Sequence, residues 1–240
     1  MKKNMMHPLM VTAGLMFLIS CNEGDKKTEE TTVMNDSSKM ETVAPEAAKP
    51  RNVMLMWHKV ANFDKWLPGY EMGDSMREAS GLHNYIIARG VDDPNMVMVA
   101  VYMDDFEKAK AFNSSAALKD AMQKSGVVGT PKTSYYDTQV LDTSTNSSTL
   151  RVMRMAKVKD FDTWRKAFDS NEQPRIDAGL KTRAIGYGSD DKHNLMVVYV
   201  AQDKKKADDM FNSQAHKDRI AAAGVEGTPE TFWYTVAKKY

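Results

Sequence analysis

The hydrophobic pattern after residue 50 alternates between short apolar runs and amphipathic stretches. Residues 53–60 are rich in Val and Met, which is typical of a β-strand. Phe63, Trp66 and Tyr70 then recur at spacings of three and four, so we expect a helix with Asn62 as its N-cap. The pattern goes on to predict a helix stop at Gly81, strands over residues 82–89 and 96–102, a second helix from the cap residue Asp104 to Gly126, and a last strand over residues 133–141.

The same series of elements returns in the second half of the chain. The motif F-D-x-W at residues 63–66 recurs at 161–164, and G-x-x-G-T-P at 126–131 recurs at 224–229. A repeat of about a hundred residues is far longer than a solenoid unit, so each copy is a small domain. Further pairs in the same order are Arg77 with Arg175, Gly81 with Gly179, Gly90 with Gly188, Phe112-Asn113-Ser114 with Phe211-Asn212-Ser213, and Lys119-Asp120 with Lys217-Asp218.

The predicted order in each copy is strand, helix, strand, strand, helix, strand. This is the ferredoxin-like unit, with both helices on one face of an antiparallel sheet. The other face needs a cover, and two sheets that pack face to face bury more surface than either alone. We therefore expect an α+β fold in which two tandem ferredoxin-like (βαββαβ) repeats form one intramolecular barrel without an obligate partner chain. Repeat 1 spans residues 51–141, a Ser/Thr-rich linker 142–149 and repeat 2 residues 150–240.

The first 50 residues have a different character. Lys2 and Lys3 precede an apolar run over residues 9–19 that is too short to span a membrane, as in a signal peptide over residues 1–20. Residues 18–21, Leu-Ile-Ser-Cys, resemble the lipobox of bacterial lipoproteins, which implies lipidation of Cys21. Residues 21–50 are polar without a period and predict a disordered tether. We expect a lipid anchor to a membrane of the bacterial cell envelope, and we favour the outer membrane or the periplasmic face over the cytoplasmic face.

Composition narrows the chemistry. The 33 Lys and Arg residues nearly balance the 32 Asp and Glu residues, and the two signs are interspersed, so nothing indicates nucleic-acid binding. Cys21 is the single cysteine, which leaves no pair for a disulfide or a thiolate metal site. The sequence lacks a phosphate-binding glycine loop, a nucleophile elbow and an HExxH motif, and its histidines do not recur at equivalent positions. We therefore expect neither a metal site nor a bound cofactor.

The repeated motifs resemble those of the dimeric α/β barrel superfamily, in particular its antibiotic biosynthesis monooxygenase-like and cyclase-like domains. The resemblance rests on F-D-x-W, R-x-x-x-G-L, the F-N-S and K-D of the second helix, and G-x-x-G-T-P, and it covers residues 51–240. It implies a fused pair in place of the usual homodimer. It also implies a pocket between sheet and helices, where members that oxidise quinol-like substrates or degrade haem place Asn, Trp or His. That set has no residue-by-residue match here, so catalytic residues stay unassigned.

The first strand holds two candidates for ligand binding. His58 follows Trp57, and it is either a base or haem ligand that faces a pocket or a hydrogen-bonded strand histidine. If the first strands align without a gap, copy 2 has Met155 and Ala156 at these positions. If they align on the shared Val-Met pair, copy 1 contains a bulge near residue 58.

Other candidates also have two interpretations. Arg77 and Arg175 keep a positive charge near the end of the first helix, where they bind an anionic group or satisfy that helix's last carbonyls. Trp66 and Trp164 either stack on a flat ligand or hold helix to sheet. The remaining ligand-binding candidates are the tyrosines Tyr85, Tyr136 and Tyr234.

Three functions fit these observations. The first is a surface lipoprotein that binds a small apolar or aromatic molecule between sheet and helices. The second is a cofactor-independent monooxygenase or isomerase of the antibiotic biosynthesis monooxygenase type, with His58, Tyr85 or Tyr136 as the base. The third is a non-catalytic structural protein of the envelope. A cavity on the order of several hundred Å³ with converging polar groups favours the first two, and an interior packed with Met and aromatic residues favours the third.

Overall fold

The structure is a computed structural model that describes residues 51–146 and 148–240. The predicted signal peptide, Cys21 and the tether lie outside these residues. Repeat 1 comprises β1 (Asn52–Val60), α1 (Phe63–Met72), α2 (Asp74–Glu78), β2 (Leu82–Gly90), β3 (Met96–Met103), α3 (Phe106–Ser114), α4 (Ala116–Lys124) and β4 (Val127–Leu141). Repeat 2 comprises β5 (Leu150–Val158), α5 (Phe161–Asp169), α6 (Gln173–Asp177), β6 (Leu180–Gly188), β7 (Asn194–Ala201), α7 (Lys204–Asn212), α8 (Gln214–Ala222) and β8 (Val225–Lys239).

The first strand is buried on both faces, which explains its nearly continuous apolar sequence. Successive side chains of a strand point to opposite faces. Met54 and Met56 therefore pack toward the helices, whereas Leu55 and Trp57 pack into the interior of the barrel. Trp57 and His58 are neighbours in sequence, yet they face different compartments.

Each predicted helix is divided into two shorter helices. Asn62 caps α1 as expected, but the second helical segment begins at the cap Asp105 and not at Asp104. That segment breaks at Ser115, whose backbone is extended and whose side chain accepts a hydrogen bond from the first turn of α4. Ser213 does the same in repeat 2. A serine that caps a new helix competes with continuation of the old one, and the apolar period does not reveal this.

The Gly-Thr-Pro segments belong to the last strands, whereas the sequence predicted turns before those strands. The pairing of β1 with β4 shifts register between Trp57 and Lys59, and that of β5 with β8 shifts between Met155 and Lys157. Gly129 adopts a φ of 75° on the β4 side, a left-handed conformation that glycine tolerates well. Both copies therefore share an irregularity at the same place, and the gap-free alignment of the first strands is correct.

A constant offset of 98 residues relates the two repeats, as the helix caps Asp105 and Asp203 show. His58 thus corresponds to Ala156.

The F-N-S triplets do not follow this offset. Phe112 corresponds to Met210, and Phe211 corresponds to Asn113, so this pair of the predicted alignment is wrong by one residue. The caps of α4 and α8 keep the constant offset, which fixes the frame on both sides of the triplets. Both phenylalanines are nonetheless buried, with exposed fractions of 6% and 5%, because each faces its sheet from a slightly different point on the helix.

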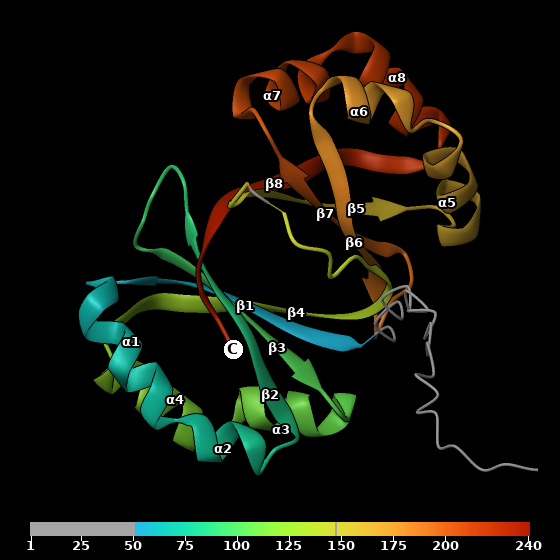
Figure 1. The fold of residues 1–240 in the computed structure, drawn as a ribbon. Coiled ribbons are helices and arrows are strands. Elements are labelled where there is room, and N and C mark those ends of the chain that lie inside the picture. Colours follow the sequence, from blue (N-terminus) through green and yellow to red (C-terminus); the bar gives the residue numbers. More distant parts are fainter. Residues whose placement is uncertain (1–50, 147) are drawn as a thin grey trace, which may run out of the picture. The chain divides into compact units, whose positions relative to one another are not determined.

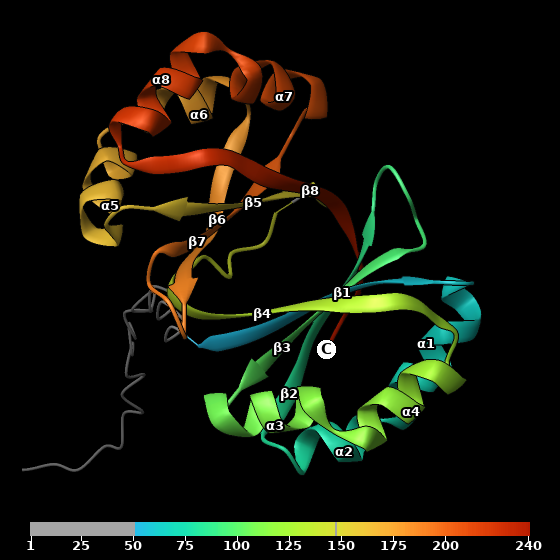
Figure 2. The ribbon, with the colours of Figure 1, turned by 180° about the vertical axis from the view of Figure 1, so that it is seen from behind.

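The two sheets close into one antiparallel barrel in the order β1-β3-β2-β8-β5-β7-β6-β4. Repeat 1 supplies β4-β1-β3-β2 and repeat 2 supplies β8-β5-β7-β6. β2 pairs with β8, and β4 pairs with β6, so each sheet's edges are hydrogen-bonded to the other copy (Figures 1 and 2). The predicted fold class is confirmed, and the sheets share their edges in addition to facing each other.

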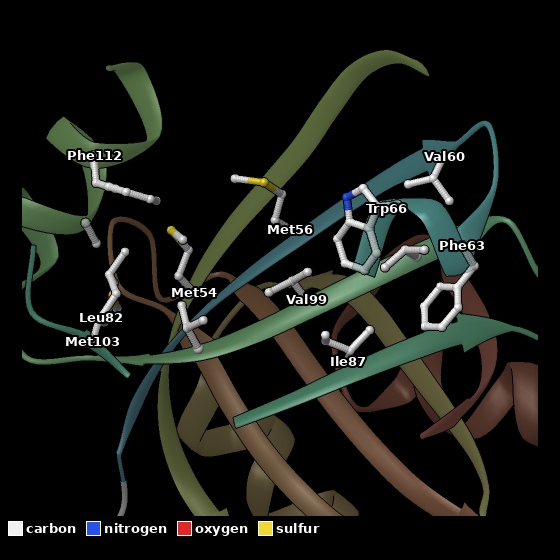
Figure 3. Packing of buried hydrophobic residues seen from close by; sticks show 13 residues of the cluster. Met54, Met56, Val60, Phe63, Trp66, Leu82, Ile87, Val99, Met103 and Phe112 are labelled. Atoms are coloured by element: carbon white, nitrogen blue, oxygen red, sulfur yellow. The ribbon is translucent and has the colours of Figure 1, made fainter. Parts of the chain in front are cut away.

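Three apolar cores follow from this architecture. One lies between the repeat 1 sheet and α1–α4, one between the repeat 2 sheet and α5–α8, and one inside the barrel. Figure 2 shows the two helical layers on opposite sides of the strands. Figure 3 shows Trp66 of α1 and Phe112 of α3 on the helical side of the first core, with Met56 and Val99 on the strands. A sheet therefore separates each helix-side space from the interior.

Candidate functional site

Each repeat encloses a cavity between its sheet and its helices. The repeat 1 cavity has a volume of about 60 Å³ and the repeat 2 cavity about 90 Å³. Trp66 and Arg77 line the first, and Trp164 and Arg175 occupy the equivalent positions in the second. The two cavities are therefore two versions of one site.

The repeat 1 cavity is apolar around a single histidine. His58 is 5% exposed, and neither of its ring nitrogens has a hydrogen-bond partner among the described residues. Burial lowers the pKa of His58 to about 4, so the imidazole is neutral at pH 7. Its ring centroid lies 5.3 Å from that of Trp66, and Met54 and Met56 line the same space. Among the described residues, the His58 ring is therefore held by packing and not by hydrogen bonds.

Arg77 lines the same cavity with its guanidinium engaged on every side. Its Nε donates to Oδ1 of Asn84 at 3.0 Å, its Nη1 to the carbonyl oxygen of Tyr70 at 2.8 Å, and its Nη2 lies 3.3 Å from Oδ1 of Asp74. The Tyr70 hydroxyl donates to the same Asn84 oxygen at 2.6 Å. Arg77 thus joins α1, α2 and β2, which is the structural interpretation of the two that the sequence allowed.

At four positions of the repeat 2 cavity a polar side chain replaces an apolar side chain of repeat 1, and at another Asn171 replaces Gly73. In exchange, the repeat 2 cavity has Ala156 where repeat 1 has His58 and Phe168 where repeat 1 has Tyr70. Two of the four new side chains are half-buried arginines, and the Nη1 of Arg154 donates to Oγ1 of Thr231 at 2.7 Å while its guanidinium lies 4.3 Å from the centroid of the Phe211 ring. The four replacements are Arg154 for Met56, Tyr199 for Val101, His216 for Leu118, and Arg219 for Ala121.

Arg175 stands at the position of Arg77 and has fewer partners. Its Nη1 donates to the carbonyl oxygens of Phe168 at 2.9 Å and Asn171 at 2.8 Å. Its Nε is buried and has no partner within the described part of the chain, because Thr182 replaces Asn84. Buried N–H groups are nearly always paired, so this donor marks an unsatisfied place in the cavity wall.

Positive charge dominates the repeat 2 cavity. Burial, together with the charges of Arg154, Arg219 and Arg175, lowers the pKa of His216 to about 4. Burial also lowers the pKa of both Arg154 and Arg175. All three guanidinium groups therefore act on one small space, and its histidine is held neutral at pH 7.

Within the described part of the chain, acidic groups do not line this space. The described residues that line the repeat 2 cavity include no Asp or Glu. Burial raises the pKa of Tyr199 to about 12, so its hydroxyl keeps its proton near neutral pH. The carboxylates that act on Arg154 and Arg175 are Asp208, Asp169 and Glu172, and all three lie outside the lining.

The remaining candidates lie inside the barrel. Trp57 is 8% exposed, and its Nε1 has no partner among the described residues. Tyr136 is 4% exposed, and burial raises its pKa to about 12. Tyr85 and Tyr234 line an interior cavity of about 290 Å³ at the linker end of the barrel. This space is separate from both helix-side cavities.

The predicted ligand-binding residues are thus divided among three places. Sequence reasoning missed Arg154, Tyr199 and Arg219, and gave His216 no role. The signal for Arg154 was present, because strand alternation from Val152 places an arginine on a half-buried, helix-facing position. The structure places His58, Trp66 and Arg77 in repeat 1, Trp164 and Arg175 in repeat 2, and Trp57, Tyr85, Tyr136 and Tyr234 inside the barrel.

Metal ligands do not gather in residues 51–146 and 148–240. No three His, Cys, Asp or Glu side chains in these ranges lie close enough together to hold an ion. His58 and His216 belong to different repeats, the first beside methionines and the second beside arginines. Each histidine can therefore act only singly, as a base or as a hydrogen-bonding group.

Comparison with known proteins supports the fold. No family model and no curated protein matches the sequence. A solved structure of a candidate monooxygenase from Lactobacillus acidophilus matches with a TM-score of 0.50 and 11% identity over 79% of this chain and 95% of its own. An anthrone oxidase-like protein matches with a TM-score of 0.53 and 11% identity over 81% and 95%, and a candidate chlorite dismutase with 0.53 and 12% over 78% and 95%. Identities this low show shared architecture, which is the dimeric α/β barrel.

Proposed function

We propose that this fused α/β barrel binds a small planar organic anion, such as an aromatic carboxylate, in the repeat 2 cavity. The observation that carries the proposal is the convergence of Arg154, Arg175 and Arg219 on a space whose described lining holds no carboxylate. Like charges that are brought together and partly desolvated disfavour one another, and an anion relieves this. The repeat 1 cavity, with one saturated arginine, has no such requirement.

The walls of the cavity suit a flat ring. The ring centroids of Trp164 and Phe168 lie 4.9 Å apart, and those of Tyr199 and Phe211 lie 6.2 Å apart. Aromatic faces and edges attract another ring through offset or edge-on packing. The volume of about 90 Å³ is below the roughly 150 Å³ of a closed apolar cavity that holds benzene, so the ligand has at most one ring and the side chains of the wall must move apart to admit it.

Benzoate is the probe for this proposal. Titration calorimetry uses residues 51–240, whose strands and three cores need no other part of the chain. One benzoate should bind per chain. The affinity for benzyl alcohol should be lower by about tenfold or more, because only the anion forms charge-assisted hydrogen bonds. Arg154→Met, which installs the residue of repeat 1, should weaken benzoate by about tenfold or more. Met56→Leu in the repeat 1 cavity is the matched control and should leave the affinity unchanged.

Two outcomes contradict the proposal. Equal affinity for benzoate and benzyl alcohol would show that the negative charge of the ligand does not contribute to binding. Wild-type benzoate affinity in the Arg154→Met variant would show that benzoate does not bind in the repeat 2 cavity.

His216 provides a second readout of the same site. In the empty cavity its pKa is about 4, and a bound carboxylate favours the protonated imidazole. The pKa therefore rises on binding, and benzoate should take up protons as the pH falls below about 6. The dependence of the binding enthalpy on the buffer's ionisation enthalpy measures this uptake. His216→Leu, which installs the residue of repeat 1, should abolish it.

Oxidation of an activated aromatic substrate without a cofactor is a second candidate function. His216 favours it, because a neutral imidazole in an apolar cavity can accept a proton from a bound phenol. Two of the structural neighbours are named for oxidative chemistry, a monooxygenase and an anthrone oxidase-like protein. Oxygen consumption with hydroquinone tests the idea. Turnover that His216→Leu abolishes, while benzoate still binds, supports it, and absence of turnover rejects it and leaves the binding proposal standing.

We also propose that a lipid on Cys21 holds the barrel at a membrane of the cell envelope. The support is the order of a basic start, an apolar run and the Leu-Ile-Ser-Cys motif. Among the described residues, no helix has the length and apolarity to cross a membrane. Cys21→Ser should move the full chain to the soluble fraction of lysed cells, and unchanged membrane association would contradict the anchor. A purely structural role in the envelope is what remains if neither binding nor turnover is found.

A further inference from the structure

The interior of the barrel contains a cavity that the two helix-side sites do not explain. Its volume is about 290 Å³, and residues of all eight strands line it. Native cores rarely contain voids larger than a water molecule, so a space of this size is not a packing defect. It lies close to the lower end of known small-molecule sites, which measure about 300–1,000 Å³. Trp57, Tyr136, Met155 and Phe232 belong to the interior core without lining this cavity, and Tyr136 and Met155 line a separate, more polar space of about 530 Å³.

Most of the cavity wall is apolar. The inward-facing side chains of the strands form it, as the alternation of strand residues requires. Such a surface suits a hydrocarbon body and offers it no specific direction. The apolar side chains deepest in the wall are Leu55, Met98, Ala100, Met153, Met196 and Val198.

Positive charge collects at the linker end of the cavity. Arg151, Arg183 and Lys239 line it there, and no Asp or Glu is among its described lining residues. Within the described chain, neither Arg151 nor Arg183 forms an ion pair. Their Nη1 groups donate to the carbonyl oxygens of Ser148 at 2.5 Å and Ser144 at 2.8 Å, respectively. Neutral carbonyls do not cancel the charge, so this end of the cavity favours an anion.

Hydroxyl groups surround the same end. Tyr85 and Tyr102 stack with ring centroids 4.6 Å apart, and Tyr234 is 2% exposed. Burial raises the pKa of both Tyr102 and Tyr234, so their phenols are protonated at neutral pH and are able to donate hydrogen bonds. Thr138 is 3% exposed, and its Oγ1 is buried without a partner among the described residues. Buried hydroxyls are normally satisfied, so this group requires a partner that the described protein does not supply.

The polar end combines residues in which the two copies differ. By the offset of the repeats, Tyr85 corresponds to Arg183, and Val53 corresponds to Arg151. At these two positions a symmetric pair of repeat 1 would place two tyrosines and two valines, and a symmetric pair of repeat 2 four arginines, whereas the fused chain brings tyrosines from one half to arginines of the other. The linker covers this end, where Ser148 Oγ donates to the carbonyl oxygen of Ala201 at 2.6 Å.

We propose that the barrel interior is a second binding site, for an amphipathic carboxylate whose apolar body fills the cavity and whose carboxylate meets Arg151 and Arg183 beneath the linker. The site is independent of the repeat 2 cavity, because the sheet of repeat 2 separates them. Its ligand is longer and more flexible than a single ring, since the space is larger and has no flat aromatic slot deep in its wall.

Decanoate is the probe, and residues 51–240 are the protein. Calorimetry should show one decanoate per chain. The affinity for 1-decanol should be lower by about tenfold or more, because the alcohol cannot form ion pairs with the arginines. Arg151→Val and Arg183→Tyr install the residues of repeat 1, and each should weaken decanoate about tenfold or more. Ala184→Leu fills the cavity without changing its charge and should also prevent binding. Arg154→Met, on the other face of the sheet, is the control and should bind decanoate as the wild type does.

The outcomes separate this site from the other one. Loss of decanoate in Arg154→Met, with Arg151→Val unaffected, would place the ligand in the repeat 2 cavity and overturn the proposal. Unchanged binding in Arg151→Val and Ala184→Leu would do so as well, and so would absence of any binding by the wild type. If Arg183→Tyr lowers the thermal midpoint of unfolding, its loss of decanoate binding is not informative. The proposal is then tested by decanoate binding to Arg151→Val and Ala184→Leu.

Discussion

The two helix-side cavities occupy the same position in two copies of one domain and have different chemistry. Repeat 1 presents His58 and two methionines beside an arginine whose three nitrogens each have a hydrogen-bond partner. Repeat 2 presents Arg154 and His216 beside an arginine whose Nε has no hydrogen-bond partner among the described residues. Strand order, helix caps and the buried tryptophan are common to both copies. The difference therefore lies in a few side chains and not in the scaffold.

This comparison distinguishes stability from function within one molecule. Positions that both copies keep, such as Trp66 and Trp164, are those the fold requires. At positions that differ, such as Met56 and Arg154, the fold accepts more than one kind of side chain. A charged residue at a half-buried position has a desolvation cost, which Arg154 offsets in part through its hydrogen bond to Thr231 and its contact with the Phe211 ring, and a bound anion would offset more of it.

The largest expected effect concerns what the copies share. Trp66 is 2% exposed and Trp164 is 4% exposed, and each joins a helix to its sheet. Trp66→Ala and Trp164→Ala should each lower the free energy of unfolding by about 3–5 kcal/mol, because a large buried side chain is replaced by a void. Urea denaturation of residues 51–240 measures both. A small loss for Trp164→Ala with complete loss of benzoate binding would instead make this tryptophan a ligand platform.

The next effect concerns the two histidines at acidic pH. The folded pKa of His58 is about 4, below its ordinary value of 6.5, so the unfolded chain binds a proton first as the pH falls. Stability should therefore be unaffected above pH 6.5 and decline toward pH 4, by about 3 kcal/mol in total from this group. His58→Leu should remove that part of the pH dependence and, with no lost hydrogen bond, should not destabilise the protein at pH 7.

His216→Leu is the matched comparison for this effect. His216 is more exposed than His58, so its removal should flatten the pH dependence less. Urea denaturation at pH 7 and pH 4.5 compares the two variants with the wild type. A His58→Leu protein with the same pH dependence as the wild type would contradict the buried, neutral histidine.

A smaller effect tests why Arg77 is saturated and Arg175 is not. Asn84→Thr gives repeat 1 the residue of repeat 2 and removes the acceptor for Arg77 Nε and the Tyr70 hydroxyl. The free energy of unfolding should fall by about 1–3 kcal/mol, because buried donors lose their partner. Thr182→Asn is the reverse exchange, and it should leave stability unchanged or raise it slightly. Equal losses for both exchanges would show that the two arginines have the same role.

The smallest expected effect is at the surface between the repeats. Lys132 of repeat 1 and Glu230 of repeat 2 form an ion pair at 2.5 Å, with side chains 57% and 63% exposed. Exposed pairs of this kind contribute less than about 1 kcal/mol, so Lys132→Ala should hardly change the thermal midpoint of unfolding. A shift as large as that of Trp66→Ala would show that this ion pair, and not the shared strand edges, holds the halves together.

Local sequence signals predicted the scaffold well. Asn62 and Asp160 are side-chain caps of the kind that start helices, and both do so here. Gly81 and Gly179 have φ angles of 69°, as expected for glycines that end a helical segment. The duplication then predicted the barrel, because an open sheet with one bare face needs a second sheet.

The site was less accessible to the same reasoning. The breaks at Ser115 and Ser213 lie inside unbroken apolar periods, so the periodicity gave no sign of them. Shared residues drew attention to Trp164 and Arg175, whereas the distinctive chemistry comes from Arg154, which the other copy lacks. Its inward position depends on strand alternation together with a tertiary layer of helices, and the second of these is visible only in the folded chain.

The most direct test of the central claim, that repeat 2 alone carries the anion site, is a residue-resolved NMR titration of residues 51–240 with benzoate. The account predicts saturable chemical-shift changes with one dissociation constant at Arg154, Tyr199 and His216, and none at His58 or Trp66. Changes of equal size around His58 and Trp66, or changes confined to repeat 1, would contradict it.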